Sequence, residues 1–212
     1  MTRILRVDFS NEFMGRISVG ARRSYLVGAG VHWAVGGPEV TFGMDPREQV
    51  KLIIAANQAR GTGYAEVIAD GVVYQLAPWD RVVGHAGGPN ATIVRPNTRL
   101  FGIAIAYPGP SQHPRGIPGE IQGPHHKFGT AWYPPISELD ELLLVSRLRA
   151  MRRHGLTADE VWGHSEINAI GGRPGGPPGK SDPFPLDMDV IRRRVEHDNA
   201  WEQAVFDYHQ SA

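Results

Sequence analysis

The apolar run from Leu100 to Tyr107 (LFGIAIAY) restricts the possible folds of this chain more than any other segment does. A strand with apolar side chains on both faces is typical of the middle of a sheet that is covered on both sides. The run is far shorter than the roughly 20 residues that a membrane-spanning helix needs. It therefore predicts a layered fold in which a central β-sheet lies between helices.

The rest of the chain alternates strands with helices and contains one hairpin. Asp70 and Gly71 favour the tight type I′ turn of a β-hairpin, and apolar residues precede and follow them. Because this hairpin interrupts the alternation, we expect a mixed sheet flanked by helices and assign the chain to the α/β class. Strands are predicted within 25–35, 64–76, 100–107 and 160–164, and helices from Asp45 to Gly61, from Ser137 to His154 and from Asp187 to Val195.

The organisation of the chain predicts one domain. No repeat or linker is visible, and 212 residues suit a single substantial core. Residues 108–135 are dense in Pro, Gly and His and show no usable period, so we predict a long loop there, a kind of segment that is often functional. We place the domain over residues 21–198, with an N-terminal extension over 1–20 and a C-terminal tail over 199–212.

Charge and cysteine content exclude several classes of partner and site. The chain has 22 basic and 22 acidic side chains, which gives no electrostatic basis for nucleic acid or an anionic membrane as the main partner. It has no cysteine, so disulfides and thiolate metal ligands are excluded, and a metal site must use His and carboxylates. The first residues, MTRILRVDFSNEFMGR, show no long apolar segment, so we expect synthesis in the cytoplasm without a secretory signal.

Two histidines and one aspartate stand where catalytic groups gather in α/β folds. His32 and His164 each lie at the end of a predicted strand, and Asp182 lies in a Pro-bounded loop (GKSDPFP). Two imidazoles and one carboxylate leave the fourth position of tetrahedral Zn²⁺ open, as in hydrolytic sites. The alternative for each histidine is a capped or core side chain with no ligand role.

Ordered sequence blocks carry a resemblance over most of the chain, from about Tyr25 to about Val195. The blocks are VHWAVG, GYAEVIADGVVYQLAPWDRVVGHAG, TRLFGIAIA, VWGHSEI and GRPGGPPGKSDPFP. They resemble the type-2 N-acetylmuramoyl-L-alanine amidases, the family that includes phage lysozyme-type amidases and the peptidoglycan recognition proteins. The resemblance implies an amidase catalytic domain with a zinc groove at one edge of the sheet.

The resemblance assigns roles to residues near the expected metal. His32, His164 and Asp182 match the zinc ligands. Lys180, two residues before Asp182, matches a catalytic lysine that helps to stabilise the oxyanion, and its alternative is a solvated loop lysine. Tyr64 matches a tyrosine beside the zinc-bound water, with a core aromatic residue as its alternative.

Three further residues are predicted to bind substrate. His85 in GHAG matches a histidine that lines the groove in relatives, and its alternative is a loop histidine with a backbone partner. Asn97 precedes the block that contains the central strand. Trp132 lies in the predicted loop, where aromatic side chains could stack on sugar or peptide, although such a loop could instead simply cover the sheet.

One position departs from the pattern of many members. They carry a glutamate that serves as general base after the Gly-Ile of the central strand, whereas this chain has Ala104 there. Alanine cannot transfer protons, so the resemblance favours the phage lysozyme-type variant, in which tyrosine and lysine support the zinc. Glu66 is the other candidate base, because it follows Tyr64 by two residues and should share its face of a strand.

The resemblance implies an enzyme that uses Zn²⁺ to hydrolyse the amide bond between N-acetylmuramic acid and L-alanine in peptidoglycan. We expect a monomer whose partner is peptidoglycan or a muropeptide, acting as a phage endolysin released by a holin or as a bacterial autolysin. A cytoplasmic recycling amidase is one alternative. Another is a recognition module that binds muropeptides without cutting them, but such modules usually replace a metal ligand, and all three positions hold suitable ligands here.

Overall fold

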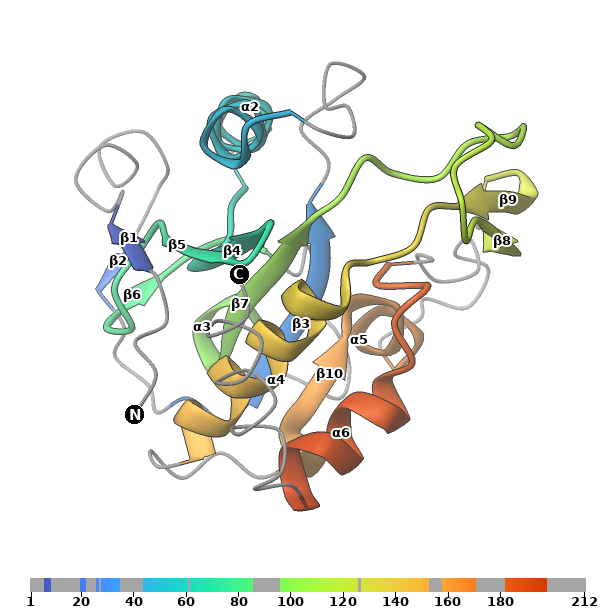
Figure 1. Cartoon of the computed structure of the whole chain (residues 1–212). Coiled ribbons are helices and arrows are strands. Elements are labelled where there is room, and N and C mark those ends of the chain that lie inside the picture. Colours follow the sequence, from blue (N-terminus) through green and yellow to red (C-terminus); the bar gives the residue numbers. More distant parts are fainter. Residues whose placement is uncertain are drawn as a thin grey trace, which may run out of the picture.

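A six-stranded mixed sheet forms the centre of the fold (Figure 1). In the computed structural model, the strands lie across the sheet in the order β1 (Arg6–Asp8), β5 (Val72–Gln75), β4 (Glu66–Ala69), β7 (Leu100–Ala106), β3 (Gly28–Ala34) and β10 (Val161–Gly163). β4, β7, β3 and β10 run parallel to one another, and β1 and β5 run in the opposite direction. The structure describes residues 6–8, 20–21, 26, 28–34, 44–60, 62–85, 96–125, 127–152, 158–170 and 182–197.

β7 is the strand predicted from the apolar run, and its place in the sheet confirms that prediction. It pairs with β4 on one side and with β3 on the other, and its residues 100–105 are buried. β4 and β5 form the expected hairpin, in which Asp70 and Gly71 both have positive φ angles of 46° and 76°. The mixed α/β sheet is therefore confirmed.

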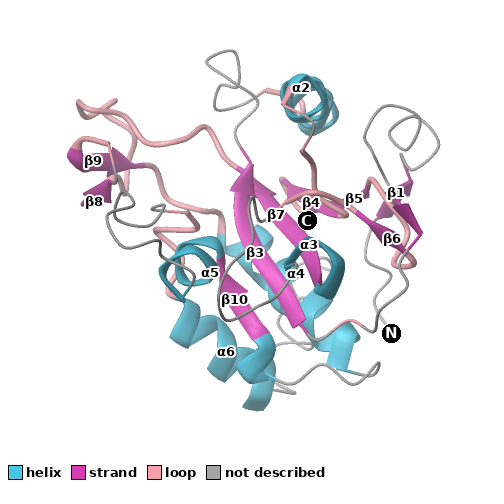
Figure 2. Ribbon diagram, turned by 180° about the vertical axis from the view of Figure 1, so that it is seen from behind, coloured by secondary structure: helices cyan, strands magenta, loops and turns pink. Residues whose placement is uncertain are grey.

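Helices cover both faces of this sheet. α4 (Glu138–Arg152) and α6 (Met188–His197) pack against each other on one face. α2 (Pro46–Ala59) packs over β4 and β7 from the opposite side, as the views from front and back show (Figures 1 and 2). α5 (His164–Ile170) contacts β3 and β10. A short α3 (Pro96–Arg99) leads into β7, and a 3-10 turn at Ala158–Glu160 leads into β10. Among the described residues, no helix has the length and apolar character needed to cross a bilayer.

The three long helices begin at the polar residues that the sequence indicates. Asp45, Ser137 and Asp187 each accept hydrogen bonds from backbone N–H groups of the first turn that follows, which would otherwise lack partners. The capped N–H groups belong to Arg47 and Glu48, to Asp140, and to Asp189 and Val190.

Residues 108–135, predicted as a loop, contain a second hairpin. β8 (Ile121–His125) pairs antiparallel with β9 (Gly129–Tyr133), and the hairpin projects from the end of the molecule near α5 (Figure 1). Gly123, Pro124 and Gly129 interrupt the alternation of apolar and polar side chains. The period on which strand prediction depends is therefore missing, although the backbone pairing is regular.

Two short segments also differ from the sequence prediction. Residues 6–8, within the expected N-terminal extension, pair with β5 as the edge strand β1 and so belong to the sheet. His164 begins helix α5, whereas the sequence suggested only a strand in this region. A separate two-stranded pair joins β2 (Gly20–Ala21) to β6 (Arg81–Val82). The proposed tail over 199–212 lies outside the described residues.

Candidate metal centre

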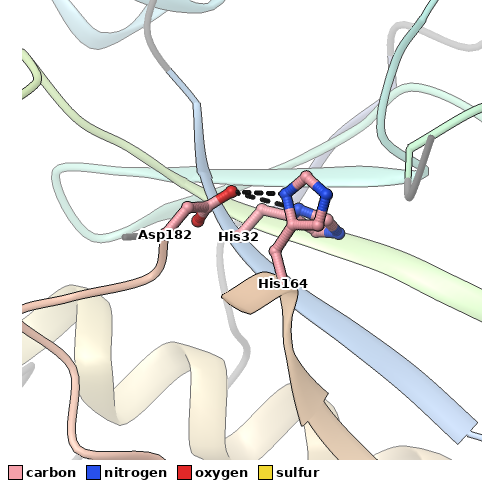
Figure 3. A group of neighbouring side chains, drawn as sticks. All are labelled: His32, His164 and Asp182. Atoms are coloured by element: carbon pink, nitrogen blue, oxygen red, sulfur yellow. Dashed lines mark hydrogen bonds and ion pairs between the residues drawn. The ribbon is translucent and has the colours of Figure 1, made fainter. Parts of the chain in front are cut away.

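Two strand ends and one loop bring two histidines and an aspartate together (Figure 3). His32 lies near the carboxyl end of β3, His164 directly follows β10, and Asp182 precedes α6. β3 and β10 pair in parallel, so their carboxyl ends meet at one edge of the sheet. One candidate ligand atom from each of the three side chains lies within 4.8 Å of the other two.

The carboxylate of Asp182 faces both imidazoles. Its Oδ2 lies 2.8 Å from His164 Nδ1 and 3.4 Å from His32 Nδ1. The backbone N–H of Trp33 donates to its Oδ1 at 2.7 Å, and the backbone N–H of Ser165 donates to its main-chain oxygen at 2.6 Å. Each histidine is thus followed by a residue whose backbone binds Asp182, which fixes the three side chains relative to one another.

The donor set fits a zinc ion. In tetrahedral zinc sites with Zn–N and Zn–O bonds of about 2.0–2.1 Å, neighbouring ligand atoms lie about 3.3 Å apart. The two contacts to Asp182 Oδ2, at 2.8 and 3.4 Å, lie close to that spacing. His32, His164 and Asp182 are only 0%, 4% and 6% exposed, so an ion held between them would be largely withdrawn from solvent.

The electrostatics of the cluster favour a cation. Burial alone raises the pKa of the Asp182 carboxyl, but hydrogen bonds from His164 and His32 and the positive charge on these rings outweigh that effect and lower the pKa to about 2. The carboxylate is therefore ionised at neutral pH. A buried anion between two imidazoles is complementary to a metal ion.

Tyr64 lies beside the cluster. Its ring centroid is 5.2 Å from that of His32, with the two planes tilted by 49°. Burial raises the pKa of the Tyr64 hydroxyl, and the nearby Asp182 charge raises it further, so the hydroxyl remains protonated and can donate a hydrogen bond. Its catalytic role stays a prediction.

Glu66 does not share the position of Tyr64, in contrast to the expectation from sequence. The chain bends at Ala65, whose carbonyl oxygen accepts N–H groups from both Leu76 and Ala77. Glu66 is the register partner of Ile103, whereas the next residue along β7, Ala104, is the partner of His32. Successive side chains of a strand point to opposite faces, so Glu66 lies on the face away from His32.

On that other face Glu66 pairs with two arginines, of which Arg6 of β1 lies 3.6 Å from its Oε1. Arg147 of α4 donates to its two carboxylate oxygens at 2.6 and 2.9 Å, and the Glu66 side chain is fully buried. Arg147 also lies 5.9 Å from the ring centroid of Trp79. These contacts assign Glu66 to the packing of α4 on the sheet rather than to the metal cluster.

His85, predicted to contact substrate, contacts the metal cluster through His32, and Asn97, predicted to do the same, contacts His85. His85 is 6% exposed, its Nδ1 lies 2.9 Å from His32 Nε2, and its Nε2 lies 3.2 Å from the main-chain oxygen of Leu100. The side-chain oxygen of Asn97 accepts the backbone N–H of His85 at 2.9 Å. Protein groups therefore engage both ring nitrogens of His85, an arrangement different from that of a groove-lining side chain.

Trp132 lies on the β8–β9 hairpin, next to the segment that follows Asp182. Its backbone pairs with that of Ser111, and the neighbouring Tyr133 packs edge-on against Phe184 with ring centroids 4.6 Å apart. A substrate contact of Trp132 stays a prediction. Lys180 lies outside the described residues.

A polar clamp that sequence analysis missed supports the position of His164. Glu166 accepts the backbone N–H of Gly163 at 2.7 Å and two hydrogen bonds from Arg192 of α6 at 2.6 and 3.0 Å. Arg192 also donates to the main-chain oxygen of Val161 at 2.9 Å. No sequence spacing links residues 26 positions apart on different elements, so only the fold reveals this contact.

Comparisons with known proteins agree with this geometry. The sequence model of the N-acetylmuramoyl-L-alanine amidase family matches residues 31–185, most of the 212-residue chain, and this range includes all three members of the cluster. A search of curated protein sequences gives no significant match.

Several solved structures share the fold at low sequence identity. The Staphylococcus aureus hydrolase AmiA, solved with its ligand, is 12% identical with a TM-score of 0.58, and the alignment covers 96% of this chain and 86% of AmiA. The catalytic domain of XlyA is 14% identical with a TM-score of 0.55, covering 92% of this chain and 99% of XlyA. A derivative of AmpD is 18% identical with a TM-score of 0.55, covering 92% of this chain and 96% of AmpD.

These likenesses show the fold, and the family match extends over the strands and loop that carry His32, His164 and Asp182. The chain belongs to the family of N-acetylmuramoyl-L-alanine amidases and is an enzyme of that class.

Proposed function

We propose that this enzyme is a zinc-dependent amidase that cuts the bond between the lactyl group of N-acetylmuramic acid and L-alanine in peptidoglycan. The observation that carries the proposal is the buried cluster of His32, His164 and Asp182, whose Nδ1, Nδ1 and Oδ2 atoms converge. Three protein ligands leave one position of a tetrahedral ion for water or substrate, as catalysis requires.

Residues of the chain would bind the metal and stabilise the oxyanion. His32, His164 and Asp182 would hold zinc, which when bound supplies Lewis acidity that polarises a carbonyl and acidifies water. Tyr64, with its protonated hydroxyl, can donate a hydrogen bond to the oxyanion that develops on the attacked carbonyl. Lys180 stands two residues before Asp182 in the sequence, and the resemblance gives its ammonium group the role of stabilising the oxyanion.

Ala104 favours a lytic role for the enzyme. It is the register partner of His32 and is fully buried, so this position next to the cluster offers no carboxylate for proton transfer. The resemblance carried by the sequence blocks implies the phage lysozyme-type variant for a chain with alanine there. We therefore propose a cell-wall-lytic enzyme, a phage endolysin released by a holin or a bacterial autolysin. A cytoplasmic recycling amidase and a non-cutting recognition module are the alternatives.

Digestion of purified peptidoglycan tests the bond that is cut. We expect release of stem peptides with new N-terminal L-alanine and intact glycan chains, detected by mass analysis and amino-terminal labelling. A chelator should stop the release and added zinc should restore it. New reducing sugar ends without new alanine amino termini would contradict the proposal. A preference for small soluble muropeptides over intact cell walls would instead favour the recycling amidase.

Substitutions of Lys180 and Tyr64 test the division of labour. Lys180→Ala should lower turnover by about a hundredfold while zinc content stays normal, the size expected for loss of one oxyanion donor. Tyr64→Phe removes one hydrogen bond but keeps the ring beside His32, and it should cost about tenfold. Lys51→Ala, which removes a surface lysine paired with Glu48, is the matched control and should be silent. A silent Lys180→Ala would remove lysine from the mechanism.

A further inference from the structure

His85 and His32 form the inner part of a hydrogen-bonded chain that ends at the backbone. The two rings meet nearly at right angles, with centroids 5.1 Å apart and an interplanar angle of 86°. His32 Nε2 lies 2.9 Å from His85 Nδ1, and His85 Nε2 lies 3.2 Å from the main-chain oxygen of Leu100. The chain thus runs from the metal cluster through two imidazoles to a carbonyl group at the start of β7.

The carbonyl oxygen of Leu100 sets the positions of the hydrogens between Leu100 and His32. A carbonyl only accepts, so His85 Nε2 must carry a hydrogen and donate it. In a neutral ring His85 Nδ1 is then an acceptor, and His32 Nε2 must donate to it. With its hydrogen on Nε2, His32 can offer the lone pair of Nδ1 to a metal, and this atom faces Asp182 Oδ2 at 3.4 Å. In the metal-free protein a hydrogen lies between these two atoms, and a bound metal ion would take its place.

Two glycines provide the space for His85. A Cβ atom at Gly102 would come within 2.6 Å of His85 Cγ, and one at Gly30 would come within 2.9 Å of His85 Cε1. Any larger residue at either position would displace the ring from its contact with His32. Asn97 adds a hydrogen bond to the His85 backbone at 2.9 Å. The fold therefore holds the His85 imidazole in one position, in contact with the metal ligand His32.

We propose that His85 is a positioning residue that holds His32 in the Nε2–H tautomer and so directs its Nδ1 lone pair at the metal. This inference rests on the proposed zinc centre and gives His85 a role different from substrate contact. Outer partners of metal-bound histidines fix ring orientation and tautomer, and their loss typically weakens metal binding by about 10- to 100-fold.

A matched pair of substitutions at His85 distinguishes the effect of its hydrogen bond to His32 from the effect of the volume of its ring. His85→Asn places an oxygen where His85 Nδ1 stands, so it can still accept from His32 Nε2–H, whereas His85→Leu has the same shape without an acceptor. We expect His85→Leu to weaken zinc binding by about 10- to 100-fold in competition with a chromogenic chelator. His85→Asn should recover most of that loss. Equal zinc affinities for the two variants would overturn the proposal.

A second readout does not depend on bound zinc. In metal-free wild-type protein, ¹⁵N NMR of the imidazole rings should show a hydrogen on Nε2 of both His32 and His85, and in His85→Leu this preference of His32 should be lost. His125→Phe, which replaces another buried histidine on the β8–β9 hairpin, is the control and should leave the His32 ring signals unchanged. A wild-type protein that binds no zinc would overturn the metal centre, while absence of the hydrogen on His32 Nε2 would overturn the positioning role by itself.

Discussion

Replacement of His164 by alanine should remove the bound zinc and lower turnover by about a thousandfold or more, since an ion that supplies several kcal/mol to the transition state would be lost. His164 Nδ1 is the ligand atom closest to Asp182 Oδ2, at 2.8 Å, and the side chain is buried. Its removal leaves two protein ligands, too few for a tight tetrahedral site. Asp182 would also lose one of the two imidazole partners of its buried charge.

Elemental analysis of the freshly prepared protein gives the direct measurement. Wild-type protein should contain one zinc per chain, and His164→Ala should contain almost none after dialysis. His113→Ala, which removes an exposed histidine outside the cluster, should keep both zinc and activity. Wild-type protein without stoichiometric zinc, even after zinc has been supplied, would contradict the metal assignment although the family membership would stand.

Replacement of Arg147 by methionine should be the most destabilising of the substitutions considered, at about 3 kcal/mol, because it leaves the buried Glu66 carboxylate with only the partly exposed Arg6, 3.6 Å away, as an ion-pair partner among the described residues. The Glu66 side chain is 0% exposed and Arg147 binds both of its oxygens. For a chain of this size the loss corresponds to a decrease of about 10 °C in the midpoint of thermal unfolding. The measurement is thermal or denaturant unfolding of both proteins at the same zinc concentration.

A double substitution serves as the control for this effect. Glu66→Leu combined with Arg147→Met removes both charges, and it should restore much of the lost stability because no buried charge remains unpaired. Glu66→Gln should leave turnover per folded molecule nearly unchanged, since Glu66 lies on the face of the sheet away from His32. Loss of turnover in a stably folded Glu66→Gln protein would restore this residue as a candidate base.

The sequence alone predicts the parts of the fold that depend on local patterns. The apolar run at 100–107, the Asp70–Gly71 turn and the capping residues Asp45 and Asp187 all lead to the elements that the structure contains. The family resemblance adds the three residues that the fold brings within ligand distance of one another. Short-range pattern and motif spacing were sufficient for these features.

Features that depend on a bend or on distant partners could not be predicted in this way. The bend at Ala65 breaks the two-residue alternation, so Tyr64 reaches His32 while Glu66 reaches Arg147 on the other face. The space for the His85 ring depends on glycines of β3 and β7, and these glycines become neighbours only when the two strands pair. Glycine and proline in the β8–β9 hairpin interrupt the alternation of apolar and polar side chains from which strands are predicted.

The clamp between Arg192 and Glu166 makes helix α6 part of the metal centre. Asp182 lies on the segment that enters α6, and Arg192 of α6 is bound to both Val161 and Glu166 beside His164. A local opening that releases α6 therefore withdraws a ligand, and an ion bound in the site lowers the population of that opening by mass action. The supply of metal around the enzyme would thus govern how long α6 resists proteolysis, as well as whether the enzyme can cut its substrate.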